Sequence, residues 1–399
     1  MKETIRVGVI GMGKRGMGTT EQVIVPQKGV IVGAVCDVYP DRAKAGADLV
    51  EKLTGTRPFE TTDASELIAL PELDAVVITA AWEAHIPLAI EAMEHGKYAA
   101  MEVAGAYTLD QCYELVKTYE RTGVPCMFLE NCCYGRYELM IQNMVRQGVF
   151  GRIVYCEGGY CHDLRDEITT GEEMRHYRLR NYQNRNLENY PSHELGPIAQ
   201  LLDINHGNRM VSLTSVASGS YGLHEYVLKT KGENDKLASV NWAQADVIDT
   251  VIKCSRGETI HIQLDTSLPR PYSRRFTVRG TKGMYMEDNN SIFLDDTPES
   301  ADHFNWKPHW DNAQQYFEQY EHPIWKEYLQ NGVQGGHDGM DWLVYGDFFR
   351  AVQNETEVPI DVYDAAAWMA ISVLSEQSIL MGGVPVAIPD FTGGKFTMR

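Results

Sequence analysis

A glycine-rich segment near the start of the chain limits the possible folds most strongly. Gly11, Gly13 and Gly16 form the pattern G-x-G-x-x-G directly after a short apolar segment at residues 6–10. The first glycine of such a turn permits a sharp bend, the second lets the backbone approach a pyrophosphate, and the third lets helix and strand pack closely. Asp37 ends the next apolar segment and can accept hydrogen bonds from ribose hydroxyls. The pattern predicts a βαβ unit that binds a dinucleotide, with NAD favoured over NADP.

Two basic residues stand inside this turn. Lys14 and Arg15 lie between the second and third glycines, and their side chains can contact the pyrophosphate or the additional 2′-phosphate of NADP. The sequence of this turn therefore leaves NADP as an alternative cofactor. The plain alternative is a glycine turn in which Asp37 only caps the backbone. The strand before the turn and the acid after the second strand favour a nucleotide site over that alternative.

Short apolar segments alternate with helical patterns over the first 128 residues. The strand candidates are residues 6–10, 30–36, 75–79, 97–102 and 126–129. Helices are predicted at 86–95 and 109–122, and either Thr108 or Asp110 is expected to cap the second of them. Strands that alternate with helices are typical of a doubly wound parallel sheet, the Rossmann arrangement.

The pattern changes after residue 130. The predicted elements are a helix at 137–147, strands at 153–160, 247–255, 259–265 and 274–279, and a helix at 365–380. A long polar loop is expected at 162–189. Successive strands without helices between them indicate an α+β domain with an open, largely antiparallel sheet. We therefore predict a Rossmann domain at 1–128 and a second α/β domain at 129–399.

Further side chains follow the later strands of the first predicted sheet. Trp82 and His85 come after the segment 75–79, and Glu102 and Asn131 stand at the ends of the later segments 97–102 and 126–129. Ligands of open α/β sheets bind at the carboxyl ends of the strands. We expect these residues to line the nucleotide groove, although Glu102 has the alternative role of capping a helix.

Composition excludes some classes of partner. The 399 residues include 55 acidic and 36 basic side chains, so the net charge is −19. Such a chain repels phosphate backbones and anionic membrane surfaces, so nucleic acid and membrane are not expected as partners. No apolar run reaches the ~18 residues of a membrane span, and no signal segment is recognised, so a cytoplasmic location is expected. The eight cysteines contain no C-x-x-C pair, so neither a disulfide framework nor a structural zinc site is expected.

Several short segments resemble one known family. They lie at 82–87, 102–103, 129–134, 147–151, 157–160, 190–197 and 335–341. In order and spacing they are similar to the Gfo/Idh/MocA superfamily of NAD(P)-dependent sugar oxidoreductases and, more narrowly, to glycoside hydrolase family 109. The resemblance implies an N-terminal Rossmann domain, a C-terminal domain for substrate binding and oligomerisation, and a homo-oligomer.

The departures from the wider superfamily favour the glycosidase branch. Glu102 is followed by Val-Ala, where the dehydrogenases carry Lys-Pro, and Asn189 stands where they carry an Asp. A plain alcohol dehydrogenase of this superfamily would lack its usual proton relay. Glu194 and Asp338 occupy positions where glycine is expected, which leaves the sugar unassigned.

The resemblance assigns roles to individual residues. It implies that His193, Tyr190 and Tyr160 are catalytic, and that Arg178 and Tyr272, with Tyr190 and His193, contact the substrate. Pro191 suits the first position of a helix, so Tyr190 and His193 would share one face of its first turn. For each residue the alternative is a structural hydrogen bond or cover for a domain edge. Pattern and resemblance together assign these residues to NAD: Gly11, Gly13, Lys14, Arg15, Gly16, Asp37, Trp82, His85, Glu102, Val103, Asn131 and Tyr190.

The resemblance also implies a reaction. NAD oxidises C3 of a small glycoside, a base removes the acidified C2 proton, the C1 substituent is eliminated, water adds, and C3 is reduced again. An N-acetylgalactosaminide is the family precedent. The first alternative is a sugar or polyol dehydrogenase that releases NADH, and the second is a catalytically silent NAD-binding regulator. His337, near two acids, is expected in a loop close to the site rather than as a metal ligand.

Overall fold

The glycine-rich segment forms the predicted turn between a strand and a helix. In the computed structural model, strand β1 (Ile5–Ile10) is buried over most of its length. Gly11 then turns the chain with a positive φ of 100°, and helix α1 (Lys14–Thr19) follows. The structure describes residues 2–295, 297, 304–330 and 332–399.

The chain divides into two compact units that are each discontinuous in sequence. The first unit is Met1–Tyr134 with Glu327–Ala367, and the second is Gly135–Lys326 with Trp368–Arg399. A segment from the last third of the chain therefore packs with the N-terminal sheet. The domain boundary near residue 128 stays a prediction.

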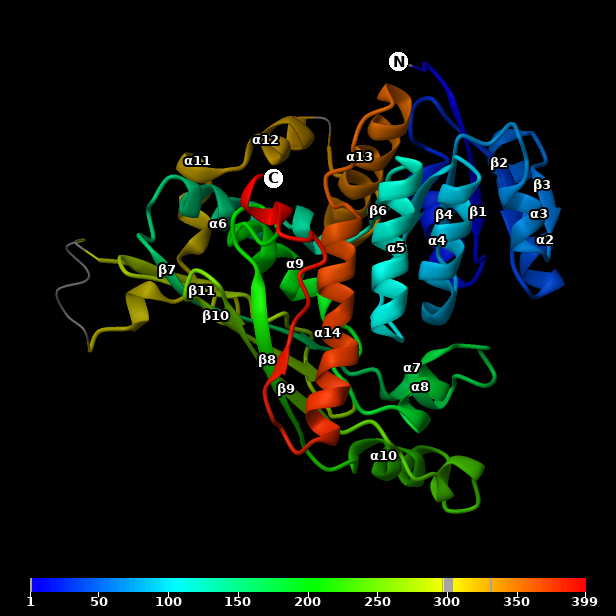
Figure 1. Cartoon of the computed structure of the whole chain (residues 1–399). Coiled ribbons are helices and arrows are strands. Elements are labelled where there is room, and N and C mark those ends of the chain that lie inside the picture. Colours follow the sequence, from blue (N-terminus) through cyan, green and yellow to red (C-terminus); the bar gives the residue numbers. More distant parts are fainter. Residues whose placement is uncertain (1, 296, 298–303, 331) are drawn as a thin grey trace. The chain divides into compact units, whose positions relative to one another are not determined.

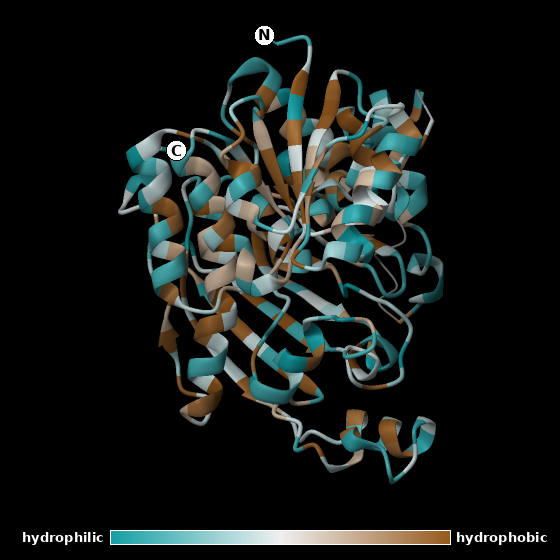
Figure 2. Cartoon of the chain, turned by 90° about the vertical axis from the view of Figure 1, so that its right-hand side faces the viewer, coloured by the Kyte–Doolittle hydropathy of each residue, from teal (hydrophilic) through white to brown (hydrophobic). Residues whose placement is uncertain are grey.

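The sheet of the first unit is parallel and has six strands in the order β3-β2-β1-β4-β5-β6. This order confirms the Rossmann prediction. Its apolar strands are brown in Figure 2, between helices whose outer faces are largely teal. The further strands are β2 (Val30–Cys36), β3 (Phe59–Thr61), β4 (Ala75–Ile78), β5 (Tyr98–Met101) and β6 (Cys126–Phe128).

The helices of the first unit begin and end at local signals. Thr108 accepts the backbone N–H of Gln111, whose side chain returns the bond, so Thr108 rather than Asp110 caps α5 (Leu109–Thr122). The helix ends at Gly123 in the left-handed region. The other helices described in this unit are α2 (Pro40–Thr54), α3 (Ala64–Ile68), α4 (His85–Glu94) and α13 (Met340–Asn354), with short turns η1 (Thr20–Ile24), η2 (Trp82–Ala84), η3 (Asn131–Tyr134) and η8 (His337–Gly339).

The second unit contains an eight-stranded sheet in the order β13-β12-β11-β7-β10-β9-β8-β14 (Figure 1). Strands β7 and β10 pair in parallel and the other neighbours are antiparallel, which confirms the predicted sheet type. The strands are β7 (Ile153–Cys161), β8 (Met210–Ala217), β9 (Val247–Cys254), β10 (Thr259–Asp265), β11 (Thr277–Gly280), β12 (Gly283–Met286), β13 (Ser291–Leu294) and β14 (Val386–Ala387).

Helices in this unit are mostly short. They are α6 (Arg136–Arg146), α7 (Arg165–Thr169), α8 (Arg178–Asn184), α9 (Ser192–Leu201), α10 (Gly222–Thr230) and α11 (Phe317–Tyr320), with turns η4 (Lys236–Ser239), η6 (Lys307–His309), η7 (Ala313–Tyr316) and η9 (Lys395–Thr397). Helices α12 (Pro323–Gln330) and α14 (Val362–Leu380) each contain a boundary between units.

The sequence reasoning was wrong in two local features. The segment 162–189, expected as one loop, contains α7 and α8, because helices of five and seven residues are too short for apolar periodicity to reveal. Pro191 is the residue before α9 rather than its first residue, although its backbone is already helical. Strands β3, β8, β12, β13 and β14 were not predicted.

In the part of the chain that is described, every helix falls short of the length and apolar character needed to cross a lipid bilayer. All eight cysteines are buried free thiols.

Candidate active site

The glycine turn of the first unit has the shape that a pyrophosphate requires. A Cβ atom on Gly11 would lie 2.6 Å from the backbone nitrogen of Ala80, and one on Gly16 would lie 1.8 Å from the Gly11 carbonyl oxygen. A Cβ atom on Gly13 would approach only the Arg42 side chain, at 3.5 Å. The first and third glycines are thus required by packing, while the second leaves room beside the backbone at the start of α1, where anions bind.

Asp37 organises this turn from the end of β2. Its Oδ2 accepts the backbone N–H of Met12 at 2.8 Å, and its Oδ1 accepts that of Tyr39 at 3.0 Å. Each carboxylate oxygen has further lone pairs, which can accept ribose hydroxyls. The turn and the acid therefore fit a dinucleotide.

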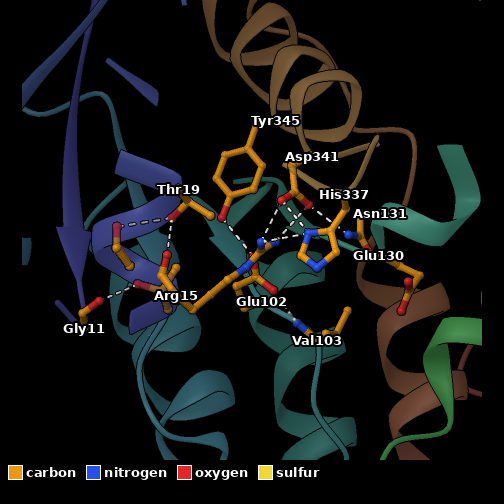
Figure 3. Close-up of polar contacts among 12 residues, drawn as sticks. Gly11, Arg15, Thr19, Glu102, Val103, Glu130, Asn131, His337, Asp341 and Tyr345 are labelled. Carbon is orange, nitrogen blue, oxygen red and sulfur yellow. Dashed lines mark hydrogen bonds and ion pairs between the residues drawn. The ribbon is translucent and has the colours of Figure 1, made fainter. Parts of the chain in front are cut away.

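Arg15 leaves the turn and enters a network of acids (Figure 3). Its Nε donates to Glu102 Oε1 at 2.8 Å, and its two terminal nitrogens donate to the two oxygens of Asp341 at 2.7 and 3.0 Å. The Tyr345 hydroxyl donates to the same Glu102 oxygen at 2.9 Å. Glu102 is therefore a partner of Arg15 rather than a helix cap. Sequence reasoning missed Asp341 and Tyr345 as site residues, although Asp341 ends one of the recognised segments.

Apart from Lys14 in α1, the other predicted cofactor residues of this unit lie where β4, β5 and β6 end. Asn131 donates from Nδ2 to Asp341 Oδ1 at 2.8 Å. Burial lowers the pKa of His85, whose Nε2 lies 2.9 Å from the Ala80 carbonyl oxygen, so this ring is neutral. Trp82 is buried in the turn before α4. Lys14 is exposed and Val103 is buried.

Five predicted residues of the second unit lie together. Tyr160 near the end of β7, Tyr190 just before α9 and His193 in its first turn are all buried. The two tyrosine ring centres are 4.3 Å apart, and the His193 ring lies 4.8 Å from Tyr190 and 5.5 Å from Tyr160. The Arg178 guanidinium, on the first residue of α8, lies 5.1 Å from the Tyr190 ring centre and 5.9 Å from that of Tyr160. Tyr272 completes the group, with its ring centre 6.5 Å from that of Tyr160.

Burial and charge set the protonation of this cluster. Burial raises the pKa of Tyr160 to about 12, against the opposing effect of Arg178, so its hydroxyl keeps its proton near neutral pH. Burial and Arg178 lower the pKa of His162, whose Nδ1 lies 3.3 Å from the Tyr160 hydroxyl. Tyr160 can therefore donate to a neutral imidazole.

Two residues of this cluster were missed from the sequence. His162 lies 5.2 Å from the Tyr272 ring, and Glu167 Oε1 lies 2.8 Å from Arg178 Nε. His162 follows Tyr160 by two positions, and alternation along a strand puts such residues on one face. That periodicity identifies His162, whereas no sequence pattern identifies Glu167. Tyr190 lies in the second unit, so its contact with the cofactor stays a prediction.

A buried acid, Glu188, contacts the backbone of this cluster. Glu188 Oε1 accepts the backbone N–H of Tyr190 at 3.3 Å, and burial raises the pKa of Glu188 to about 8. The folded protein therefore binds this proton between about pH 4.5 and pH 8, whereas the unfolded chain has released it. The free energy of unfolding should fall as the pH rises through this range.

Glu188→Gln tests this dependence. The neutral amide cannot ionise, so the variant should lose this part of the slope, which approaches about 1.4 kcal/mol per pH unit for one proton. Urea unfolding at pH 5, 6, 7 and 8 measures the slope for both proteins. Equal slopes would contradict the assignment of the buried proton to Glu188.

Models of known families cover most of the chain. Residues 5–129 match the oxidoreductase family with an NAD-binding Rossmann fold, and residues 134–398 match the C-terminal domain of glycosyl hydrolase 109. The first match agrees with the turn around Gly11, and the second contains the whole Tyr160–His193 cluster.

Individual proteins give the same result. The chain is similar to an α-N-acetylgalactosaminidase of Tannerella forsythia, with 36% identity over 99% of this chain and 88% of the relative, and to a glycosyl hydrolase family 109 protein of Parabacteroides distasonis, with 37% identity and the same coverage. Its fold is similar to that of scyllo-inositol dehydrogenase from Lactobacillus casei with bound NAD(H) and scyllo-inositol, with a TM-score of 0.66, 12% identity, and coverage of 96% of this chain and 99% of that one. Because the similarity to the glycosidases extends over nearly all of its length, the chain belongs to glycosyl hydrolase family 109, the NAD-dependent glycosidases built on a Rossmann domain.

Proposed function

We propose that this enzyme hydrolyses α-linked N-acetylgalactosaminides with NAD as a resident cofactor that is not consumed. The observation that carries the proposal is the buried contact of Tyr160, Tyr190 and His193 beside Arg178, in a chain whose first unit has a pyrophosphate turn. The name of the Tannerella forsythia relative supports the sugar, and Asp37 beside the turn supports NAD over NADP.

The bound cofactor supplies reversible oxidation of the sugar hydroxyl at C3, which makes the C2 proton acidic and is reversed at the end of the cycle. His193 takes the proton of that hydroxyl at a ring nitrogen and later returns it. Arg178 holds substrate oxygens and lowers the cost of negative charge on the nearby phenols.

The two tyrosines have different roles in the proton transfers of the elimination and addition steps. Tyr190, the nearer to Arg178, removes the C2 proton at its hydroxyl oxygen, and the bond from C1 to the leaving oxygen breaks. Tyr160, which keeps its proton, donates it to the leaving oxygen. Water then adds to C1 and its proton restores Tyr160. The proton on Tyr190 exchanges with solvent while the substrate is unsaturated, and Tyr190 then returns a solvent-derived proton to C2. The net reaction is hydrolysis, and no pair of catalytic carboxylates takes part.

Two parallel incubations separate a glycosidase from a sugar dehydrogenase. The enzyme is supplied in heavy water with an aryl α-N-acetylgalactosaminide and, in a second vessel, with free N-acetylgalactosamine. We expect release of the phenol, deuterium at C2 of the product, and no accumulation of NADH absorbance at 340 nm.

The contrary outcomes are distinct. Hydrolysis without deuterium at C2 would remove the elimination step. Stoichiometric NADH from the free sugar, with no phenol release, would identify a dehydrogenase instead.

A further inference from the structure

One of the segments that resemble glycoside hydrolase family 109 has no role in the proposed reaction. Residues 335–341 contain turn η8 and the start of α13, and their backbone is unusual. His337, Asp338 and Gly339 all have a positive φ, at 50°, 53° and 96°. Asp338 thus occupies a left-handed position that favours glycine, which explains why glycine is expected there. This strained turn places the next acid, Asp341, in the first turn of α13.

The Asp341 carboxylate is buried and fully engaged (Figure 3). Its side chain is 2% exposed and accepts from both terminal nitrogens of Arg15, from Asn131 Nδ2 and from His337 Nδ1 at 2.7 to 3.0 Å. Burial alone would raise the pKa of Asp341, but the bonds from His337 and Arg15 hold it well below its usual range. The carboxylate is therefore charged at all working pH values.

The same contacts exclude Asp341 as a metal ligand. Two donors of Arg15, one of Asn131 and one of His337 already occupy the carboxylate lone pairs. A cation would also meet the Arg15 guanidinium within hydrogen-bond distance of the same oxygens. The charge of Asp341 is balanced by Arg15, so its function concerns the residues that it holds.

Two of those residues stand at the proposed cofactor groove. Arg15 follows Gly13 in the turn, and Asn131 follows β6 at the carboxyl edge of the sheet. On the opposite side Glu102 accepts from Arg15, so the guanidinium is held between two carboxylates. A guanidinium that is bound by carboxylates has a fixed orientation, whereas an arginine side chain without such partners samples many rotamers.

We propose that Asp341 is a positioning residue of the cofactor site, which fixes Arg15 and Asn131 in the arrangement that retains NAD. The inference rests on the proposed function, because it requires that the glycine turn binds NAD. Asp341 lies 326 residues after Arg15 in the chain. Cofactor retention therefore depends on a residue outside the N-terminal segment that matches the Rossmann family.

The first test is Asp341→Asn, with Asp338→Asn as the matched control. Asp338 is exposed and loses the same charge, and asparagine tolerates its left-handed backbone. The full-length proteins are stripped of nucleotide and titrated with NAD by tryptophan fluorescence and calorimetry. We expect the Kd to rise at least about tenfold in Asp341→Asn, which corresponds to ~1.4 kcal/mol of lost binding free energy, and to stay unchanged in the control.

A double-mutant cycle separates positioning from a structural role. If Asp341 acts through Arg15, the change Asp341→Asn raises the NAD Kd less in an Arg15→Met background than in the wild type. Additive effects on the Kd would overturn the proposal, as would an unchanged Kd in Asp341→Asn. If Asp341→Asn does not fold, Asp341→Glu, which moves the charge by one methylene, takes its place with the same outcomes.

The wild-type titration distinguishes this inference from the proposed function. A wild-type protein that binds NAD while Asp341→Asn binds it equally well overturns the inference alone. A wild-type protein that binds no pyridine nucleotide overturns the proposed function, and the inference with it.

Discussion

Replacement of His193 by alanine is expected to lower kcat for glycoside hydrolysis by about 10²- to 10⁴-fold, the range for loss of a positioned general base. The centre of the His193 ring lies 4.8 Å from that of Tyr190 and 5.5 Å from that of Tyr160. A substrate hydroxyl that reaches these phenols can therefore pass its proton to His193. The cofactor turn belongs to the other unit. NAD content should therefore stay close to one per chain while turnover is lost.

The measurement pairs phenol release with the amount of NAD liberated by acid from the same sample. His261→Ala is the control, because His261 lies in β10, pairs with Asp249, and has no role in the proposed reaction. Turnover by His193→Ala within about threefold of the wild type would contradict the assignment of His193 as the base.

Gly16→Ala is expected to weaken cofactor binding strongly. The added Cβ would lie 1.8 Å from the Gly11 carbonyl oxygen and 2.7 Å from Thr79 Oγ1, so the backbone of the turn must move. Overpacking of this kind costs about 1–3 kcal/mol, and 3 kcal/mol of misfit in the turn corresponds to a roughly hundredfold rise in the NAD Kd. The Tm should fall as well.

Gly18→Ala is the matched control for this change. Gly18 lies in the same helix, and a Cβ there would meet nothing within 4 Å. The control should bind NAD as the wild type does and be more stable by about 0.5–1 kcal/mol, because alanine favours the helix. NAD binding by Gly16→Ala that equals the control would show that close contact at Gly16 is not required.

The N-terminal half of the fold was predictable because its signals are local. The turn around Gly11 follows its strand directly, and Thr108 stands three residues before its partner Gln111. Alternation of strands and helices then determines the sheet type, since parallel strands need crossover connections. The short helices α7 and α8 were missed because five or seven residues carry too few apolar positions to define a period.

The candidate site was predictable only in part, and for a related reason. Resemblance to a family identified Tyr160, Tyr190 and His193, since residue types alone favour a structural role for each. It did not identify the partners of Arg15. The bond to Asp341 joins residues far apart in sequence, and periodicity contains no information about such contacts.

The return of Glu327–Ala367 to the N-terminal unit has a consequence for biosynthesis. At about 5–20 residues per second, the ribosome delivers Asp341 and Tyr345 long after the nucleotide-binding strands have emerged. Until then Arg15 and Glu102 lack two of their final partners. If Asp341 positions Arg15 as proposed, we expect the nascent chain to bind the dinucleotide tightly only after this last segment has folded onto the N-terminal unit.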